Sequence, residues 1–94
     1  MIYVKNASNK LVLVAINKWG KRGGTGYFNI NPGTVEGWDR TDGRGFVMSI
    51  IREGEAEPKP YFVLSNSNII IHDKDITGYG RDVEDSDHWI YPLN

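Results

Sequence analysis

Apolar and polar residues alternate over short stretches of the chain, and turn-forming residues interrupt these stretches at close intervals. An alternation with a period of two is typical of β-strands, whose successive side chains point to opposite faces. No window has the spacing of three and four residues that an amphipathic helix needs, and eleven glycines punctuate the chain. We therefore expect no helix and predict strands within residues 2–5, 11–17, 27–31, 34–41, 44–52, 61–64, 69–72 and 88–91.

These strands predict a small two-sheet antiparallel β-sandwich, because they are short and are separated by Gly, Asn and Pro turns. A small closed β-barrel is the alternative architecture. Residues 11–17 are apolar on both faces, so we expect their strand to lie centrally in a sheet. A length of 94 residues predicts one domain over residues 1–94, with a thin core and little room for a deep pocket.

The Asp42-Gly43 pair is a strong signal for a two-residue type I′ turn, and it predicts a hairpin of residues 34–41 with residues 44–52. In that register Thr41 faces Arg44, and alternate residues share a face of the sheet. One face collects the better core residues, namely Val35, Gly37, Phe46, Met48 and Ile50. Trp38 then stands on the outer face between Glu36 and Arg40.

A tryptophan between an acceptor and a donor suits a sugar ring, because the indole stacks on C–H groups while the charged neighbours bind hydroxyls. The alternative is that Trp38 packs beneath a loop and that Glu36 pairs with Arg40. Polar residues follow Trp38 at one end of the predicted sandwich, Trp19 precedes a basic glycine-rich loop, and Tyr79 lies between glycines. The candidate carbohydrate-binding residues are Trp38, Asp39, Arg40, Asp42, Arg44, Trp19 and Tyr79.

Each of these candidates also has a structural interpretation. Asp42 and Gly43 are common turn formers, and Arg44 can cap a carboxylate. Trp19 can cover the rim of the core.

Composition excludes several classes of function. A formal net charge of −1 argues against general binding of nucleic acid, and no apolar run approaches the roughly 18 residues of a membrane helix. The chain has no cysteine and its first residues form a predicted strand, so we expect a cytoplasmic protein, or one released without a signal peptide.

Catalytic and metal chemistry find little support in the sequence. Residues 82–88 are acidic but lack the spacing of a calcium loop, and we expect a solvated turn there. His72 and His88 do not form a zinc pattern. The adjacent Ser86, Asp87 and His88 do not have the geometry of a catalytic triad. We therefore expect no metal, no cofactor and no enzymatic activity.

Three runs of sequence resemble a known family: INKWG at residues 16–20, YFNINPG at 27–33 and EGWDRTDGRGF at 36–46. They are similar to the small fruiting-body lectins of mushrooms, of the Lyophyllum type, which bind α-linked galactose. The resemblance implies a fungal defence lectin and hemagglutinin that is homodimeric, needs no metal and recognises terminal α-galactose on glycolipids or glycoproteins. No site residue is assigned through the resemblance.

Two further expectations concern the partners. The apolar residues 68–71 supply the dimer contact if their strand lies at a sheet edge, or belong to the core if it lies centrally.

The functions that compete with a lectin are a membrane-active or pore-forming defence protein and a protein-binding or inhibitory domain. The wide separation of the tryptophans, at 19, 38 and 89, weakens the membrane-active hypothesis.

Overall fold

The computed structural model describes residues 1–17, 26–80, 83–86 and 90–93, with the backbone alone described at 79–80 and 83–86. These residues form ten β-strands and no helix, which confirms the all-β prediction, and each predicted segment overlaps a strand. The strands are β1 (Ile2–Asn6), β2 (Val12–Ile16), β3 (Phe28–Ile30), β4 (Val35–Trp38), β5 (Phe46–Arg52), β6 (Lys59–Val63), β7 (Ser67–Ile71), β8 (Ile76–Gly80), β9 (Val83–Ser86) and β10 (Ile90–Pro92). Over the same residues, no helix is long and apolar enough to cross a membrane.

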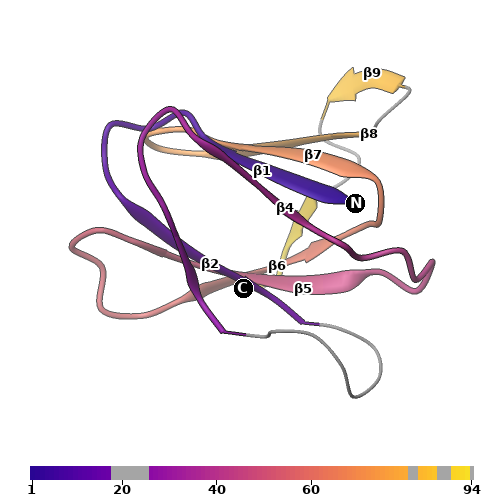
Figure 1. Ribbon diagram of the computed structural model, residues 1–94, viewed down its shortest axis with the longest axis horizontal. Helices are drawn as coiled ribbons and strands as arrows, with labels where there is room; N and C mark the ends of the chain where they lie inside the picture. The colour runs from indigo at the N-terminus through magenta and orange to yellow at the C-terminus, as the bar shows by residue number, and fades with distance from the viewer. Residues whose placement is uncertain (18–25, 81–82, 87–89, 94) are drawn as a thin grey trace.

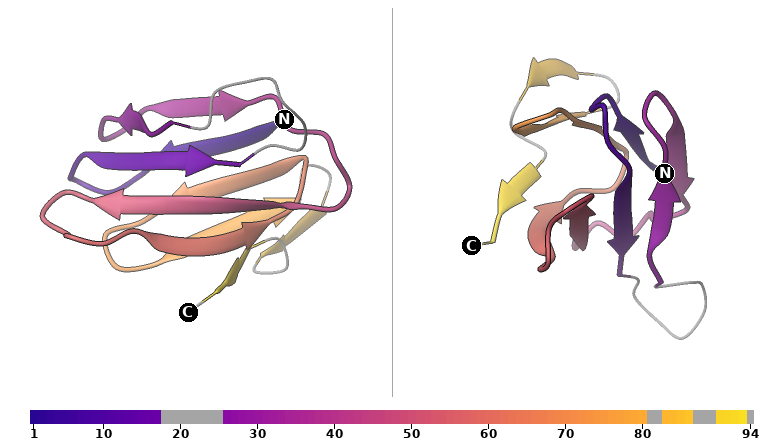
Figure 2. Two further views of the ribbon diagram at one scale, coloured as in Figure 1. Left: turned by 90° about the horizontal axis from the view of Figure 1, so that it is seen from below. Right: turned by 90° about the vertical axis from the view of Figure 1, so that its left-hand side faces the viewer.

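The strands form two separate five-stranded sheets that pack face to face, which confirms the β-sandwich rather than the closed barrel (Figures 1 and 2). Sheet A has the order β4-β1-β7-β8-β9, and sheet B has the order β10-β6-β5-β2-β3. β2 lies between β5 and β3, inside its sheet as the apolar run predicts. The strand pairs are antiparallel except β1 with β7, which run parallel.

The core lies between the sheets and is built from alternate residues of each strand. β1 and β7 show strict alternation of buried and more exposed positions, as do the first five residues of β5. Burial of this kind contributes on the order of 25 cal/mol for each Å² of apolar surface removed from water. The core side chains are Ile2, Val4, Val12, Val14, Ile16, Ile30, Trp38, Phe46, Met48, Ile50, Val63, Ile69, Ile71 and Ile90.

The predicted hairpin between residues 34–41 and 44–52 is wrong. β4 pairs with β1 in sheet A, whereas β5 pairs with β2 and β6 in sheet B. A type I′ turn needs positive φ at both central residues, but the residue with positive φ here is Gly45, at +88°. The Gly45 amide donates to the Asp42 carbonyl at 3.3 Å, so the turn sends the chain from one sheet into the other.

The face assigned to β4 is inverted as a consequence, whereas the face assigned to β5 is correct. Trp38 is 5% exposed and Val35 is 51% exposed, the reverse of the expectation. The cause is the pairing of β4 with β1, which sets Trp38 opposite the buried Ile2. On β5, Phe46 and Met48 point into the core as expected, and Val47 is exposed.

Strands β8 and β9 are absent from the prediction. Residues 83–86 pair with β8 as β9, so the solvated turn expected at residues 82–88 is wrong over that stretch. Glycines masked the pattern of β8, and one of them is needed for packing. A Cβ on Gly78 would lie 2.9 Å from Ile90 Cγ2 and 3.2 Å from Ile69 Cδ1.

The strand proposed as a dimer contact lies inside sheet A. β7 is flanked by β1 and β8, and Ile69 and Ile71 are buried. Residues 68–71 therefore belong to a central strand, which was the alternative interpretation, and its edges are not available for pairing with a second chain.

Candidate functional site

The candidate site lies at the side of the sandwich where β3 and β4 form neighbouring edges. β3 is the outer strand of sheet B and β4 is the outer strand of sheet A. A tight turn joins them, with Gly33 at a φ of +82° and its amide donating to the Asn6 carbonyl at 2.7 Å. This turn carries the chain from one sheet to the other, so side chains from the two strands meet across the gap.

Phe28 and Trp38 make the central contact of this side. Their ring centroids are 5.7 Å apart and their planes stand at 80°, which is the favoured edge-to-face arrangement. Phe28 pairs with Val14, so it points to the inner face, but at the sheet edge its side chain remains 48% exposed. The buried Trp38 fills the gap between the two sheets, and Phe28 presents aromatic surface to solvent.

The indole Nε1 of Trp38 is buried, and it has no hydrogen-bond partner among the described residues. Leaving a buried donor unpaired costs about 1–3 kcal/mol, and native structures contain few such groups. The unpaired Nε1 is therefore an unusual feature of this side of the sandwich.

A recess of about 160 Å³ lies beside this aromatic pair. It is lined by Phe28, Glu36, Gly37, Trp38, Asp39 and Arg40. The exposed carboxylates of Glu36 and Asp39 therefore stand next to an aromatic surface, and this combination of groups can bind a hydroxylated ring.

Arg40 has a different environment from the one expected of a surface ligand. It is almost fully buried, and its Nε and Nη2 groups donate to the carbonyls of Asn17 and Ile16, at 2.9 and 3.1 Å. The guanidinium thus ties the end of β4, in sheet A, to the end of β2, in sheet B. Its main role is to fix the wall of the recess.

Asp42 and Arg44 form an exposed ion pair on the β4–β5 loop rather than part of the recess. Their closest atoms, Oδ2 and Nη2, are 2.7 Å apart, and the Arg44 amide donates to Asp42 Oδ1 at 2.9 Å. The hydrogen bonds from Arg44 lower the pKa of Asp42, and the carboxylate raises the pKa of Arg44 in return. This pair supports the turn, which matches the structural interpretation of these residues.

The remaining two candidates are not brought to the recess by the described structure. Trp19 lies outside the described residues. Tyr79 belongs to β8, and two strands, β1 and β7, separate β8 from β4. The recess therefore unites three of the seven candidates with Phe28 and Glu36. Phe28 could have been found from its place in the alternating segment 27–31.

Within the described part of the chain, no group of three His, Cys, Asp or Glu residues is placed to hold a metal ion. Comparison of the chain with family models, curated proteins and solved structures gives no match.

Proposed function

We propose that this protein is a non-catalytic lectin whose recess between β3 and β4 binds a terminal α-linked galactose. The observation that carries the proposal is the Phe28–Trp38 pair with the Glu36 and Asp39 carboxylates beside it. The axial 4-hydroxyl of galactose leaves one continuous apolar face of the ring. That face can lie on the exposed part of Phe28, as aromatic stacking requires.

The polar groups of the recess have complementary tasks. The carboxylates of Glu36 and Asp39 accept hydrogen bonds from sugar hydroxyls, and charge-assisted bonds of this type are among the strongest available. Arg40, tied to backbone carbonyls, keeps Asp39 and Trp38 in place without a bound sugar.

A single shallow recess binds weakly, so agglutination of cells requires more than one site on each particle. We therefore include a homodimer in the proposal. With β7 central in its sheet, the dimer contact must use another surface. The exposed side chains of Tyr3 on β1 and Val35 on β4, on the outer face of sheet A, offer one.

The edge formed by β3 and β4 favours a second candidate function, a protein-binding domain. Two neighbouring edge strands with exposed Tyr27 and Val35 can pair with an extended segment of another protein. This candidate predicts that free sugar does not compete for binding.

A glycan array tests the proposal at physiological salt, with free galactose and free glucose as competitors. We expect α-galactosyl glycans to bind and galactose alone to displace them. Absence of any glycan signal from a folded sample would remove the lectin function and favour the protein-binding domain.

Variants locate the site. Phe28→Ala should weaken binding about tenfold, since the stacking surface is lost. Tyr91→Ala is the matched control, because Tyr91 is a half-exposed aromatic on β10, at the opposite edge of the same sheet. Equal effects of Phe28→Ala and Tyr91→Ala would place the sugar elsewhere.

A further inference from the structure

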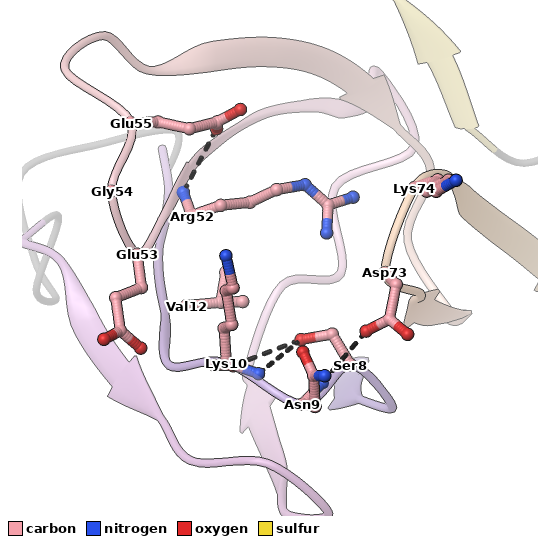
Figure 3. A pocket seen from close by; sticks show the side chains of 10 residues that line it. All are labelled: Ser8, Asn9, Lys10, Val12, Arg52, Glu53, Gly54, Glu55, Asp73 and Lys74. Atoms are coloured by element: carbon pink, nitrogen blue, oxygen red, sulfur yellow. Dashed lines mark hydrogen bonds between the residues drawn. The ribbon is translucent and has the colours of Figure 1, made fainter.

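A second and larger cavity lies at the other end of β2 from the recess. Arg40, which lines the recess, donates to the carbonyl of Ile16 at one end of β2. The second cavity adjoins Val12 at the other end of β2 and has a volume of about 530 Å³. We call it the end cleft. Three turns surround it, those joining β1 to β2, β5 to β6 and β7 to β8 (Figure 3). The lining residues are Ser8, Asn9, Lys10, Val12, Arg52, Glu53, Gly54, Glu55, Asp73 and Lys74.

Side chains fasten the three turns to one another. Asp73 Oδ1 accepts the Asn9 amide at 3.0 Å, and Glu53 Oε1 accepts the Leu11 amide at 3.2 Å. Arg52 reaches from β5 to the β7–β8 turn, where it donates to the carbonyls of His72 and Asp75. The cleft is therefore held open by the protein itself, as a binding site with little reorganisation cost requires.

Each carboxylate of the end cleft has a partner for one of its oxygens, whereas the lysines of the cleft have no ion-pair partner among the described residues. Glu53 and Asp73 each hold a backbone amide with one oxygen, and Glu55 pairs with Lys59 at 3.3 Å. Lys10 and Lys74 have no ion-pair partner in the part of the chain that the structure describes. Their ammonium groups are therefore available to a ligand.

Figure 3 shows the Lys10 side chain extending from its turn toward the Arg52 side chain, with the carboxylates of Glu53 and Asp73 on either side in this view. Arg52 uses two of its five N–H groups on the turn carbonyls. Each of the two carboxylates retains one oxygen. The free groups are thus mainly cationic donors, together with two anionic acceptors.

We propose that the end cleft binds an acidic saccharide, a hydroxylated ring that carries a carboxylate or a sulfate. The anionic group pairs with Lys10 and Arg52, because the Lys10 side chain extends toward Arg52 and has no ion-pair partner among the described residues. Ring hydroxyls donate to the second oxygens of Glu53 and Asp73, and these hydrogen bonds offset the repulsion between the two carboxylates and the anionic group of the saccharide. None of the described residues that line the cleft is aromatic, so binding depends on charge and hydrogen bonds instead of stacking.

This site is independent of the recess and follows different physics. Affinity in the recess depends on an aromatic surface and should vary little with salt. Affinity in the end cleft should fall several-fold between 20 and 500 mM salt, because the Debye length shortens to a few ångströms.

Backbone-amide NMR titrations of the whole chain test the proposal, with galacturonate, galactose 6-sulfate, galactose and sodium sulfate as the four probes. We expect the two acidic sugars to shift amides at residues 8–12, 52–55 and 73–74, with galactose and sulfate binding there at least tenfold more weakly. If sulfate alone binds as tightly as the acidic sugars, the cleft is an anion site that does not recognise a sugar ring. If galactose binds as tightly as the acidic sugars, the anionic group of the ligand does not contribute to binding. Either result, or no shift with any probe, overturns the proposal.

Variants make the test specific to the end cleft. Lys10→Gln should weaken binding of galacturonate about threefold to tenfold, as expected for the loss of one partly exposed charge pair. Lys5→Gln is the matched control, since Lys5 is an exposed lysine on β1 that does not line the cleft. Amide shifts at residues 8–12, 52–55 and 73–74 report on the end cleft alone, because none of these residues lines the recess. If galactose does not bind at the recess, this result for the end cleft is unaffected. The two proposals are therefore tested independently.

Discussion

Phe28 and Trp38 pack edge to face, with their ring centroids 5.7 Å apart, although one belongs to sheet B and the other to sheet A. This single contact closes one side of the sandwich and also forms the wall of the recess. The two rings differ in burial, because Trp38 is enclosed in the core and Phe28 is half exposed. Stability should therefore depend mainly on Trp38, and ligand binding on Phe28.

Trp38→Ala should destabilise the fold by about 3–5 kcal/mol, the usual cost of truncating a buried aromatic side chain. Trp38→Phe should cost less, because the ring largely fills the cavity and the unpaired Nε1 is removed. Urea denaturation followed by circular dichroism measures both. A Trp38→Ala variant as stable as the wild type would show that the side chain is not part of the core.

Asn6→Ala should cost about 2–4 kcal/mol, because the buried Asn6 side chain bonds several backbone groups that would lose their partner. Its Nδ2 donates to the carbonyls of Lys10 and Ile30, at 2.7 and 2.8 Å, and its Oδ1 accepts the Ser8 amide at 3.0 Å. Asn9→Ala, at an exposed position of the same turn, is the control and should cost under about 0.5 kcal/mol. Thermal or urea unfolding of the two variants compares them directly, and equal losses would argue against the role of Asn6.

Gly45→Ala should destabilise the protein more than Gly54→Ala. Both glycines have positive φ, +88° and +91°, so an added Cβ strains the backbone by about 1 kcal/mol in each case. At Gly45 the Cβ would also overlap the ring of Phe62, whereas at Gly54 it would meet open space. The difference between the two unfolding free energies isolates the steric contribution, and a difference of zero would mean that Phe62 moves aside freely.

Asp42 should titrate below the usual pKa of an aspartate, because hydrogen bonds from Arg44 stabilise its ionised form. A lowered pKa in the folded state means that any stabilisation by the pair is present at neutral pH and is lost as the pH falls through that lowered pKa. Carboxyl ¹³C NMR measures the titration. Arg44→Gln should return the pKa of Asp42 toward its ordinary value, and no change in that variant would exclude Arg44 as the cause.

Much of the strand pattern can be predicted from the sequence, because alternation is a local property. The apolar residues 11–17 predict a central strand, and β2 is one. The alternation of Phe46, Val47 and Met48 predicts which side of β5 faces the core, and their burial agrees. β8 and β9 escaped prediction because glycines and acidic residues fill positions where strands usually carry apolar side chains.

Strand pairing could not be predicted in the same way. The Asp42-Gly43 signal is local and favours a hairpin, but the pairing of β4 with β1 joins residues at least 30 positions apart. That pairing turned Trp38 inward and Val35 outward. Two candidates therefore changed role: Trp38 became a core residue, and Arg40 became a tie between the sheets.

The residues that share the recess or the end cleft could not be predicted from the sequence either. Phe28 and Trp38 are ten residues apart and in different sheets, so only the crossing at Gly33 brings their rings together. The end cleft collects residues from three turns that no local pattern connects.

The sequence by itself determined the all-β class, the position of most strands, the absence of disulfides and the chemical character of the candidate site, because these depend on composition and on neighbouring residues. Only the tertiary structure decided which strands pair, which face of β4 is buried and which side chains share a cavity. Those features depend on contacts between distant segments, and a one-residue change of register or a different partner strand reverses them.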